Sequence, residues 1–468
     1  MELETMGIIS LVPAVIAIVL SFVTKNTIVA LLTACFAGTL LAGNGLLAFP
    51  GLIKTACGTT DFSWVMLLNL YIAVIVAFFH KTGAIQGFSA WVQSKKLSRK
   101  ATQLVAWFLG IFVYFSDSFS PLFVGTVMRD ISDKAKISKE KLSYIADSTA
   151  APVSVLVPIT GWAAYLMGLA IGVGCIVTQE DATALFMKAI PLNFYPLFAV
   201  IMVGLVASGI VKDFGPMKKA EKRAMEEGKI SRDGANPLIG KELMEMEPYP
   251  GVKANVGLNF VLPVFMIITI ALGTYFTLGS AKTMEAFLFT AIFMAISMFF
   301  QGIPFKEIMD TVTQGIKSGV PAVTLLALAY SVNALSKQMG TANFIISSCS
   351  DFLQPAILPA IIFVVAAIMA FATGSSWGTF AICMPIALPL AFAYTNNELT
   401  TLVVACFAAV AGGGVFGDHC SPMSDTTILA STGAAADHID HVKTQLPYSL
   451  VCGGLAVIGY LIIGFTAL

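Results

Sequence analysis

The chain has 468 residues, of which 57% are hydrophobic and only 12% are charged, and its formal net charge is zero. A soluble domain carries about 25% charged residues, so this chain has too few charges to cover a water-facing surface. The zero net charge also gives no electrostatic basis for binding nucleic acid. The composition therefore predicts an all-α integral membrane protein whose apolar side chains face a lipid bilayer.

A spanning helix needs about 20 mostly apolar residues, and stretches of roughly this kind occur along the whole chain. The uninterrupted ones lie at residues 7–23, 28–43, 64–79, 185–211, 256–278, 286–300, 359–372 and 448–468. Others are broken by polar residues, at 101–128, 145–177, 320–335, 377–393 and 402–415. The pattern predicts about ten to twelve spanning elements.

One charged segment divides the chain into halves of similar length. Residues 212–253 contain nine basic and eight acidic residues. We therefore predict a first membrane repeat at 1–211, a charged cytoplasmic linker at 212–255 and a second membrane repeat at 256–468. Because Lys and Arg are enriched in cytoplasmic loops, two further basic clusters should lie on the same side as the linker. They are Lys95, Lys96, Arg99 and Lys100, and Lys134, Lys136, Lys139 and Lys141.

The stretch 101–128 lies between these two clusters, so it must cross the membrane twice or turn back within it. It is too short for two full crossings, and the polar run Ser116-Asp117-Ser118-Phe119-Ser120-Pro121 interrupts it. The simplest solution is a re-entrant hairpin with a polar tip inside the protein, where protein or water satisfies the irregular backbone. Broken elements of this kind mark the binding sites of secondary transporters.

The second half contains two comparable interruptions, at 373–378 and 411–422. Because the latter holds four glycines and a proline, we expect it not to be ordinary helix interior. Both halves also contain the pattern Phe-small-Asp-x-x-Ser-Pro, at 115–121 and 416–422. The match supports an internal repeat with a broken element in each copy.

Carboxylates in or beside these broken segments are the strongest indication of an ion site. A charged side chain at the centre of a spanning helix costs about 2.5–3.5 kcal/mol on insertion scales. Na⁺ is a hard cation that takes carboxylate, hydroxyl and freed carbonyl oxygens, and a carboxylate in a low-dielectric site also has a raised affinity for protons. The acids are Asp117, Asp147, Asp418 and Asp425, and the hydroxyl residues that follow them include Ser118, Ser120, Ser148, Thr149 and Ser421. The alternative for these acids, above all Asp147 and Asp425, is capping of a helix N-terminus.

Two other polar clusters have simpler interpretations. The pair His419-Cys420 suggests a thiol nucleophile, but adjacent side chains rarely face each other in a useful way. Residues 437–441 suggest a metal site, but ligands this close together, with no partner cluster elsewhere, favour a polar surface loop. No nucleophile or metal constellation predicts an enzyme, and no repeated filter motif predicts a channel.

The longest polar motif resembles the NhaC-type sodium/proton antiporters, which belong to a wider ion-transporter superfamily. It runs from 414 to 433 and continues at 437–448. Residues 373–379 and 141–152 are similar to the same family, so the resemblance covers both halves. The chain departs from the family at Tyr114-Phe115-Ser116-Asp117, where many relatives have two adjacent acids.

The resemblance implies a multi-pass transporter of the bacterial inner membrane, with two inverted repeats that each contain a re-entrant hairpin and a broken helix. Transporters of this superfamily are similar in often forming homodimers. The resemblance also implies that ion and substrate sites lie where the hairpin tips meet the broken helices. On this chain the matching residues are Asp117, Asp147, Thr373, Ser375, Ser376, Asp418, Ser421 and Asp425.

We therefore predict a sodium-coupled secondary transporter, with Na⁺/H⁺ antiport by alternating access as the first choice. Na⁺ is then the coupling ion, held by Asp117 and Asp418 without any further cofactor, and Asp147 or Asp425 is a second titrating group. Ser375, Ser376 and Ser421 would supply hydroxyl ligands.

The alternative is sodium-driven uptake or exchange of a small organic acid or amino acid. Its carboxylate would face helix N-termini. The missing acid of the first motif and the Thr-Gly-Ser-Ser run at 373–376 both suit this alternative.

Overall fold

A computed structural model describes residues 6–24, 26–88, 97–114, 117, 119–158, 160–238, 246–252, 254–278, 282–341, 344, 348 and 354–466. The helices of the first half and the linker are α1 (Val12–Thr24), α2 (Thr27–Leu41), α3 (Phe49–Cys57), α4 (Thr60–Lys81), α6 (Arg99–Phe112), α7 (Phe119–Lys134), α8 (Lys139–Ser148), α9 (Ala151–Ser154), α10 (Gly161–Ala170), α11 (Gln179–Ala189), α12 (Phe194–Ser208) and α13 (Gly215–Lys222). Those of the second half are α15 (Leu262–Leu278), α16 (Thr283–Phe300), α17 (Phe305–Gln338), α19 (Leu358–Thr373), α20 (Ser376–Ala393), α21 (Thr401–Cys420), α22 (Asp425–Ala434) and α23 (His438–Thr466).

The described residues form helices and connecting segments with two isolated β-bridges, which confirms the predicted all-α class. Six helices are long and apolar enough to cross a membrane, and a pair bent by 47°, 180–192 with 194–208, would add a seventh. The six lie at 62–81, 257–278, 355–373, 376–393, 401–420 and 438–466. The larger number predicted from the sequence also counts broken and re-entrant elements, which this length criterion leaves out.

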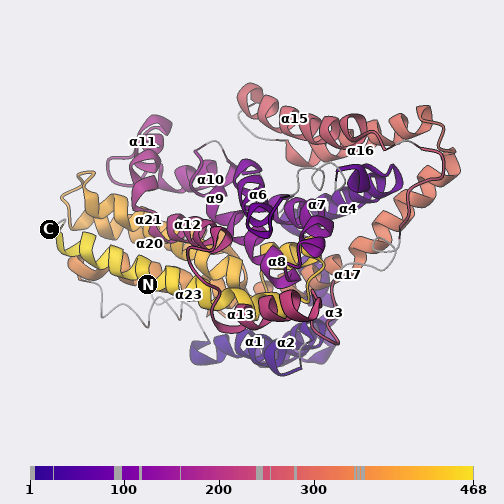
Figure 1. The fold of residues 1–468 in the computed structure, drawn as a ribbon. Coiled ribbons are helices and arrows are strands. Elements are labelled where there is room, and N and C mark those ends of the chain that lie inside the picture. Colours follow the sequence, from indigo (N-terminus) through magenta and orange to yellow (C-terminus); the bar gives the residue numbers. More distant parts are fainter. Residues whose placement is uncertain are drawn as a thin grey trace.

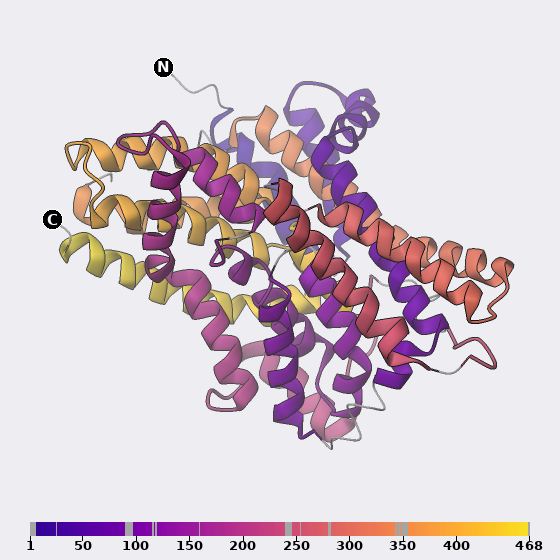
Figure 2. The ribbon, with the colours of Figure 1, turned by 90° about the horizontal axis from the view of Figure 1, so that it is seen from above.

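The helices pack around three apolar cores. The first gathers α4, α6, α7, α8, α15 and α16, the second α10 to α12, α19 to α21 and α23, and the third α1, α2 and α17. Figure 2 shows α19 to α21 and α23, in orange and yellow, on one side of the molecule and α16 and α17, in salmon, on the other. On the outer helices large apolar side chains face outward, as Phe276 and Phe300 do with 72% and 82% of their surface exposed. Exposure of large apolar side chains is unfavourable in water but not in the hydrocarbon core of a bilayer.

The glycines of the second Asp motif lie inside a regular helix, so the expectation that 411–422 interrupts the helix throughout is wrong. α21 continues unbroken to Cys420, and the break comes only at Ser421 and Pro422. The glycines serve close packing instead, because a Cβ on Gly413 would lie 2.5 Å from the carbonyl oxygen of Phe363 in α19. Gly417 meets the α19 backbone in the same way. Small residues four apart allow such close helix pairs in membranes.

The helices α6 and α7 form the predicted hairpin. They contact each other, and Asp117 lies in the turn between them. At the far end, Arg99 at the start of α6 pairs with Glu221 of the linker, and the backbone N–H of Lys139, just after α7, donates to a linker carbonyl oxygen at 3.0 Å. Both open ends of the hairpin therefore lie on the linker's side, as the basic clusters predict.

The two halves meet where α7 crosses α22, the helices that follow the two copies of the Asp motif. A Cβ on Gly125 would lie 2.5 Å from the backbone nitrogen of Ala434, and one on Gly433 would lie 2.6 Å from the carbonyl oxygen of Leu122. Glycine is needed at both positions because backbone touches backbone there. At the other end of α22, Asp425 interacts electrostatically with Asp117 of the α6–α7 turn.

The linker is docked on the helices rather than free. Figure 1 shows α13 beside α8 and α23, and the three helices contact one another. Tyr448 of α23 donates its hydroxyl to Asp213 at 2.8 Å. Ion pairs join the linker to the starts of α8 and α23: Lys141 with Asp213, Arg223 with Glu140 at 2.9 Å, and Arg232 with Asp437 at 3.0 Å and with Asp440 at 2.5 Å.

Candidate functional site

The break between α21 and α22 buries a carboxylate among hydroxyl groups. Asp418 lies in the last turn of α21 with 2% of its surface exposed, and Ser424 donates its hydroxyl to Asp418 Oδ1 at 2.5 Å. Ser424 is also the N-cap of α22, and its oxygen lies 3.1 Å from that of Thr426. The Ser-Pro of this break ends α21, because proline cannot continue the helix, and so leaves backbone groups of the turn free for other partners.

Two further carboxylates share this region. Asp425, the first residue of α22, and Asp117, from the α6–α7 turn, both interact electrostatically with Asp418. Asp425 also accepts a hydrogen bond from the backbone N–H of Thr426 at 2.9 Å. Among the described residues no three acidic, His or Cys side chains are close enough to form a metal cluster by themselves. A cation here would therefore need hydroxyl and backbone oxygens beside the carboxylates.

The interruption between α19 and α20 is where the sequence predicts it. Gly374 adopts a left-handed conformation with φ +66°, and a Cβ there would lie 2.7 Å from the carbonyl oxygen of Met423. The three predicted ligands in this segment differ in role. Thr373 bonds its own helix at 2.8 Å and Ser375 caps α20, whereas the buried Ser376 lies beside the Asp418 carboxylate.

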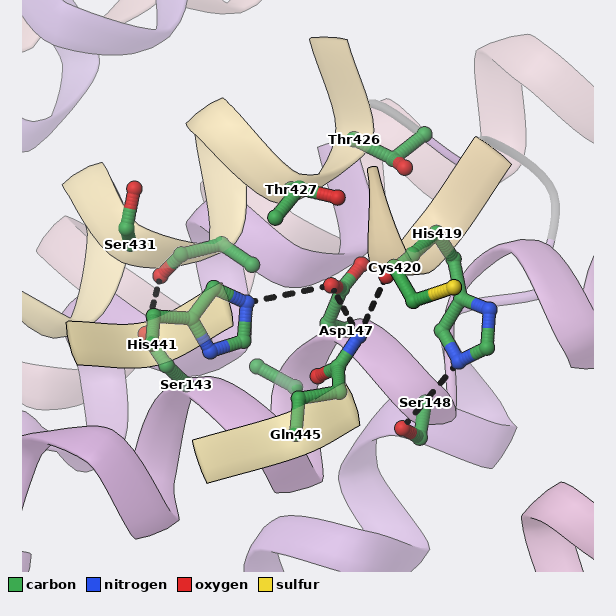
Figure 3. Close-up of polar contacts among 12 residues, drawn as sticks. Ser143, Asp147, Ser148, His419, Cys420, Thr426, Thr427, Ser431, His441 and Gln445 are labelled. Carbon is green, nitrogen blue, oxygen red and sulfur yellow. Dashed lines mark hydrogen bonds and ion pairs between the residues drawn. The ribbon is translucent and has the colours of Figure 1, made fainter. Parts of the chain in front are cut away.

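The fourth predicted acid, Asp147, forms a separate network (Figure 3). It lies in the last turn of α8, so capping of a helix N-terminus is wrong for it. Its Oδ2 accepts hydrogen bonds from Gln445 Nε2 at 2.8 Å and from His441 Nε2 at 3.1 Å, and all three residues are completely buried. The Gln445 amide also donates to the carbonyl oxygen of His419 in α21. The network thus joins α8 to α21 and α23.

For Asp425 the capping alternative is correct only in part. The N-cap of α22 is Ser424, and Asp425 takes the next position, where a negative charge near the helix N-terminus is favourable.

The predicted hydroxyl residues divide between the two networks and the local backbone. Ser148 lies 3.4 Å from His419 Nε2, whereas Ser421 bonds the carbonyl oxygen of Phe371 at 2.8 Å. Ser120 donates to the backbone of α6, and Thr149 to its own helix. Ser118 lies outside the described residues.

Several buried polar residues that the sequence does not single out as ligands belong to these networks: Tyr195, His419, His441 and Gln445. The interpretation of 437–441 as a surface loop is wrong, because His438 and His441 are 3% and 0% exposed and belong to α23. Their burial comes from contacts with distant elements that the local sequence does not predict. His438 bonds Ser431 of α22 and the Pro422 carbonyl oxygen, and His441 bonds Asp147 of α8. The spacing of His441 and Gln445 by four residues is a signal for one helix face.

Comparison with known proteins gives a family and relatives. The model of the Na⁺/H⁺ antiporter family matches residues 153–465. An uncharacterised protein of Haemophilus influenzae is 33% identical over 98% of this chain and 91% of its own length. A protein of Bacillus subtilis named malate-2H⁺/Na⁺-lactate antiporter is 27% identical over 44% of this chain and 42% of its own. The Na⁺/H⁺ antiporter NhaC of Alkalihalophilus pseudofirmus is 26% identical over 34% of this chain and 33% of its own.

Proposed function

This chain belongs to the Na⁺/H⁺ antiporter family, which makes it a multi-pass, sodium-coupled secondary transporter, and we propose that it exchanges Na⁺ for H⁺ at a site built around Asp418. The resemblance to NhaC-type antiporters is thereby confirmed. The observation that carries the proposed site is the buried Asp418 carboxylate at the broken α21–α22 junction, bonded by Ser424 at 2.5 Å.

The residues around Asp418 suit Na⁺ as the transported ion. Ser424, Thr426 and Ser376 place hydroxyl oxygens at or near the carboxylate. Asp117 and Asp425 add negative charge from both halves of the chain. Carboxylates that repel one another in a low-dielectric site are stabilised by a bound cation, so these three acids favour Na⁺ binding.

The hairpin and broken helices give this site a route to alternating access. Asp117 comes from the α6–α7 turn, whereas Asp418 and Asp425 flank the α21–α22 break. Their elements touch through the glycine contacts between α7 and α22, where movement of one half against the other would change access to the ion. We place the linker in the cytoplasm of a bacterial cell, with the helices in its inner membrane, in line with the basic clusters beside it and the bacterial relatives.

The test is exchange by purified protein in liposomes that contain a pH-sensitive dye. An inward Na⁺ gradient should drive protons out through the wild type, and Asp418→Asn should abolish this movement and the thermal stabilisation by NaCl. The control is Asp310→Asn, which removes an exposed carboxylate of α17 and should change neither. Normal Na⁺-driven proton movement by folded Asp418→Asn would refute the assignment.

A second function, exchange of a small carboxylate together with Na⁺, is favoured by one feature beside the site. The N-terminus of α20 begins at Ser376, and such a terminus attracts carboxylates. Trp377, on the same first turn, contacts Trp162 and Tyr165, whose rings are 5.8 and 4.8 Å away. The Bacillus relative's name includes malate and lactate. If this function holds, malate or lactate raises the melting temperature only with Na⁺ present and accelerates Na⁺ flux; no effect of either acid would exclude both as substrates.

A further inference from the structure

The Asp147 carboxylate is buried, and no lysine or arginine among the described residues forms an ion pair with it. Its Oδ2 accepts two hydrogen bonds, but its Oδ1 has no hydrogen-bond partner among the described residues. Lys139 and Lys141, at the opposite end of α8, pair with Asp133 and Asp213 instead. A buried charge that is not paired costs several kcal/mol, and a carboxylate escapes this cost by taking up a proton.

His441 offers a second proton-accepting atom next to the carboxylate. While Asp147 is ionised, His441 Nε2 must carry the hydrogen that Oδ2 accepts, which leaves His441 Nδ1 as the bare nitrogen. That Nδ1 also has no partner among the described residues. The pair can therefore gain one proton, at Asp147 Oδ1 or at His441 Nδ1, and its net charge then changes from minus one to zero.

Gln445 connects this pair to the Na⁺ site. Its single amide group donates both to Asp147 Oδ2 and to the carbonyl oxygen of His419, the residue that follows Asp418. Because one amide group makes both hydrogen bonds, a change in the protonation of Asp147 alters the hydrogen bond to the end of α21. Asp147 belongs to the first half of the chain and the other residues to the second, so the bridge joins the two halves.

We propose that the Asp147–His441 pair is the proton-carrying site of the exchange, separate from the Na⁺ site at Asp418, with Gln445 as the positioning residue that couples the two. The proposal rests on the Na⁺/H⁺ exchange proposed above. In the step itself one proton from water on one side forms an O–H or N–H bond within the pair. The same bond breaks when the proton is released on the other side.

The titratable neighbours of this pair do not supply a permanent positive charge. The helices packed against it contribute Tyr195 from α12, Asp418, His419 and Cys420 from α21, Asp425 from α22, and Asp437, His438 and Asp440 from α23. α23 also carries Lys443, whose positive charge interacts with Asp440. The charged residues of α6, α7 and α13 nearest the start of α8 are engaged in their own pairs, such as Arg99 with Glu221 and Asp133 with Lys139. The proton is therefore the cation available to the pair.

The first test separates proton movement from Na⁺ binding. Exchange of labelled ²²Na⁺ against unlabelled Na⁺ across liposomes requires no net proton transfer. We expect Asp147→Asn to reduce Na⁺-driven proton movement at least about tenfold while ²²Na⁺ exchange stays within about threefold of the wild type. Asp418→Asn should lose both. Normal proton movement by Asp147→Asn, or equal loss of both activities, would overturn the separate proton site, whereas a wild type that moves no protons would refute Na⁺/H⁺ exchange itself.

The second test uses His441, and it tests the proton site even if Asp147→Asn does not fold. His441→Leu removes a donor that favours the ionised carboxylate, so the pH of half-maximal exchange should rise by about one unit. His441→Gln restores a donor and should return that pH toward the wild-type value. The control is His80→Leu, a buried histidine of α4 whose Nε2 lies 3.3 Å from an Arg129 guanidinium nitrogen and which is not a neighbour of the pair. It should lower stability without moving the pH midpoint; equal midpoints in all three variants would refute the role of His441.

Discussion

Adding a single methyl group at Gly413 should separate α21 from α19. A Cβ there would lie 2.5 Å from the carbonyl oxygen of Phe363 and 2.8 Å from the Cβ of Ala366, whereas ordinary contacts begin near 3.4 Å. The helices would therefore have to move apart by about 1 Å, and overpacking of this kind costs about 1–3 kcal/mol. Alanine also gains about 0.5–1 kcal/mol over glycine inside a helix, which partly hides the cost.

A matched variant removes that ambiguity. A Cβ on Gly454, in α23, would meet nothing within 4 Å, so Gly454→Ala should show the helix-propensity gain alone. The difference in unfolding free energy between Gly413→Ala and Gly454→Ala then measures the cost of the overlap. We expect a difference of about 1–3 kcal/mol when the detergent-solubilised variants are unfolded by heat or by denaturant. Gly413→Ala should also weaken Na⁺ stabilisation, since Asp418 lies on the same helix. Equal stability of the two variants would show that α19 and α21 do not touch at this glycine.

The docked linker gives two further predictions. Arg223→Ala should lower the melting temperature, because it removes the cation beside the Glu140 carboxylate, which is only 5% exposed. The control Lys229→Ala should leave the melting temperature unchanged, because the ion pair of Lys229 with Asp233 is exposed. Lys229 lowers the pKa of Asp233, so any contribution of this ion pair to the free energy of unfolding is present at neutral pH and is lost as the pH falls through the lowered pKa. The melting curves of the two variants should therefore be compared at pH 7. Tyr448→Phe should cost about 1.5–3 kcal/mol, because its hydroxyl donates at 2.8 Å to a linker carboxylate, and a variant as stable as the wild type in denaturant unfolding would contradict that bond.

The fold class and the breaks could be predicted from the sequence because they depend on local composition. Long apolar stretches indicate spanning helices, and the polar run at 116–121 and the glycine at Gly374 mark where helices end. The glycines at 412–417 mislead the same reasoning, since their effect depends on a neighbour. Glycine weakens an isolated helix, but against the backbone of α19 it allows a contact that any larger residue prevents.

The aspartates of the candidate site could be predicted from the sequence, because a charged residue in an apolar segment indicates a functional role. Asp147 and Asp418 were identified in this way, and both are buried in polar networks. Ser376, beside Asp418, was also identified. The partners of Asp147 were not, because the sequence indicates that His441 and Gln445 lie in an exposed polar stretch. Whether such a stretch is buried depends on elements that are distant in the sequence. Asp147 of α8 contacts His441 and Gln445, and Arg232 of the linker covers the start of the stretch.

Buried ion pairs join the linker to the two helices that carry the proposed proton site, and this constrains how the transporter can move. Arg223 ties the linker to the start of α8, and Arg232 ties it to the start of α23 through two carboxylates that are 4% and 14% exposed. One or two turns further along, the same two helices carry Asp147, His441 and Gln445. Ion pairs buried to this extent are not broken cheaply, because separating them leaves charges without partners. If α8 or α23 moved away from the linker during alternating access, these ion pairs would have to break in every transport cycle. Movement of α8, α23 and the linker as one body avoids it, and places the moving boundary at the α7–α22 crossing and at the Gln445 bridge to α21.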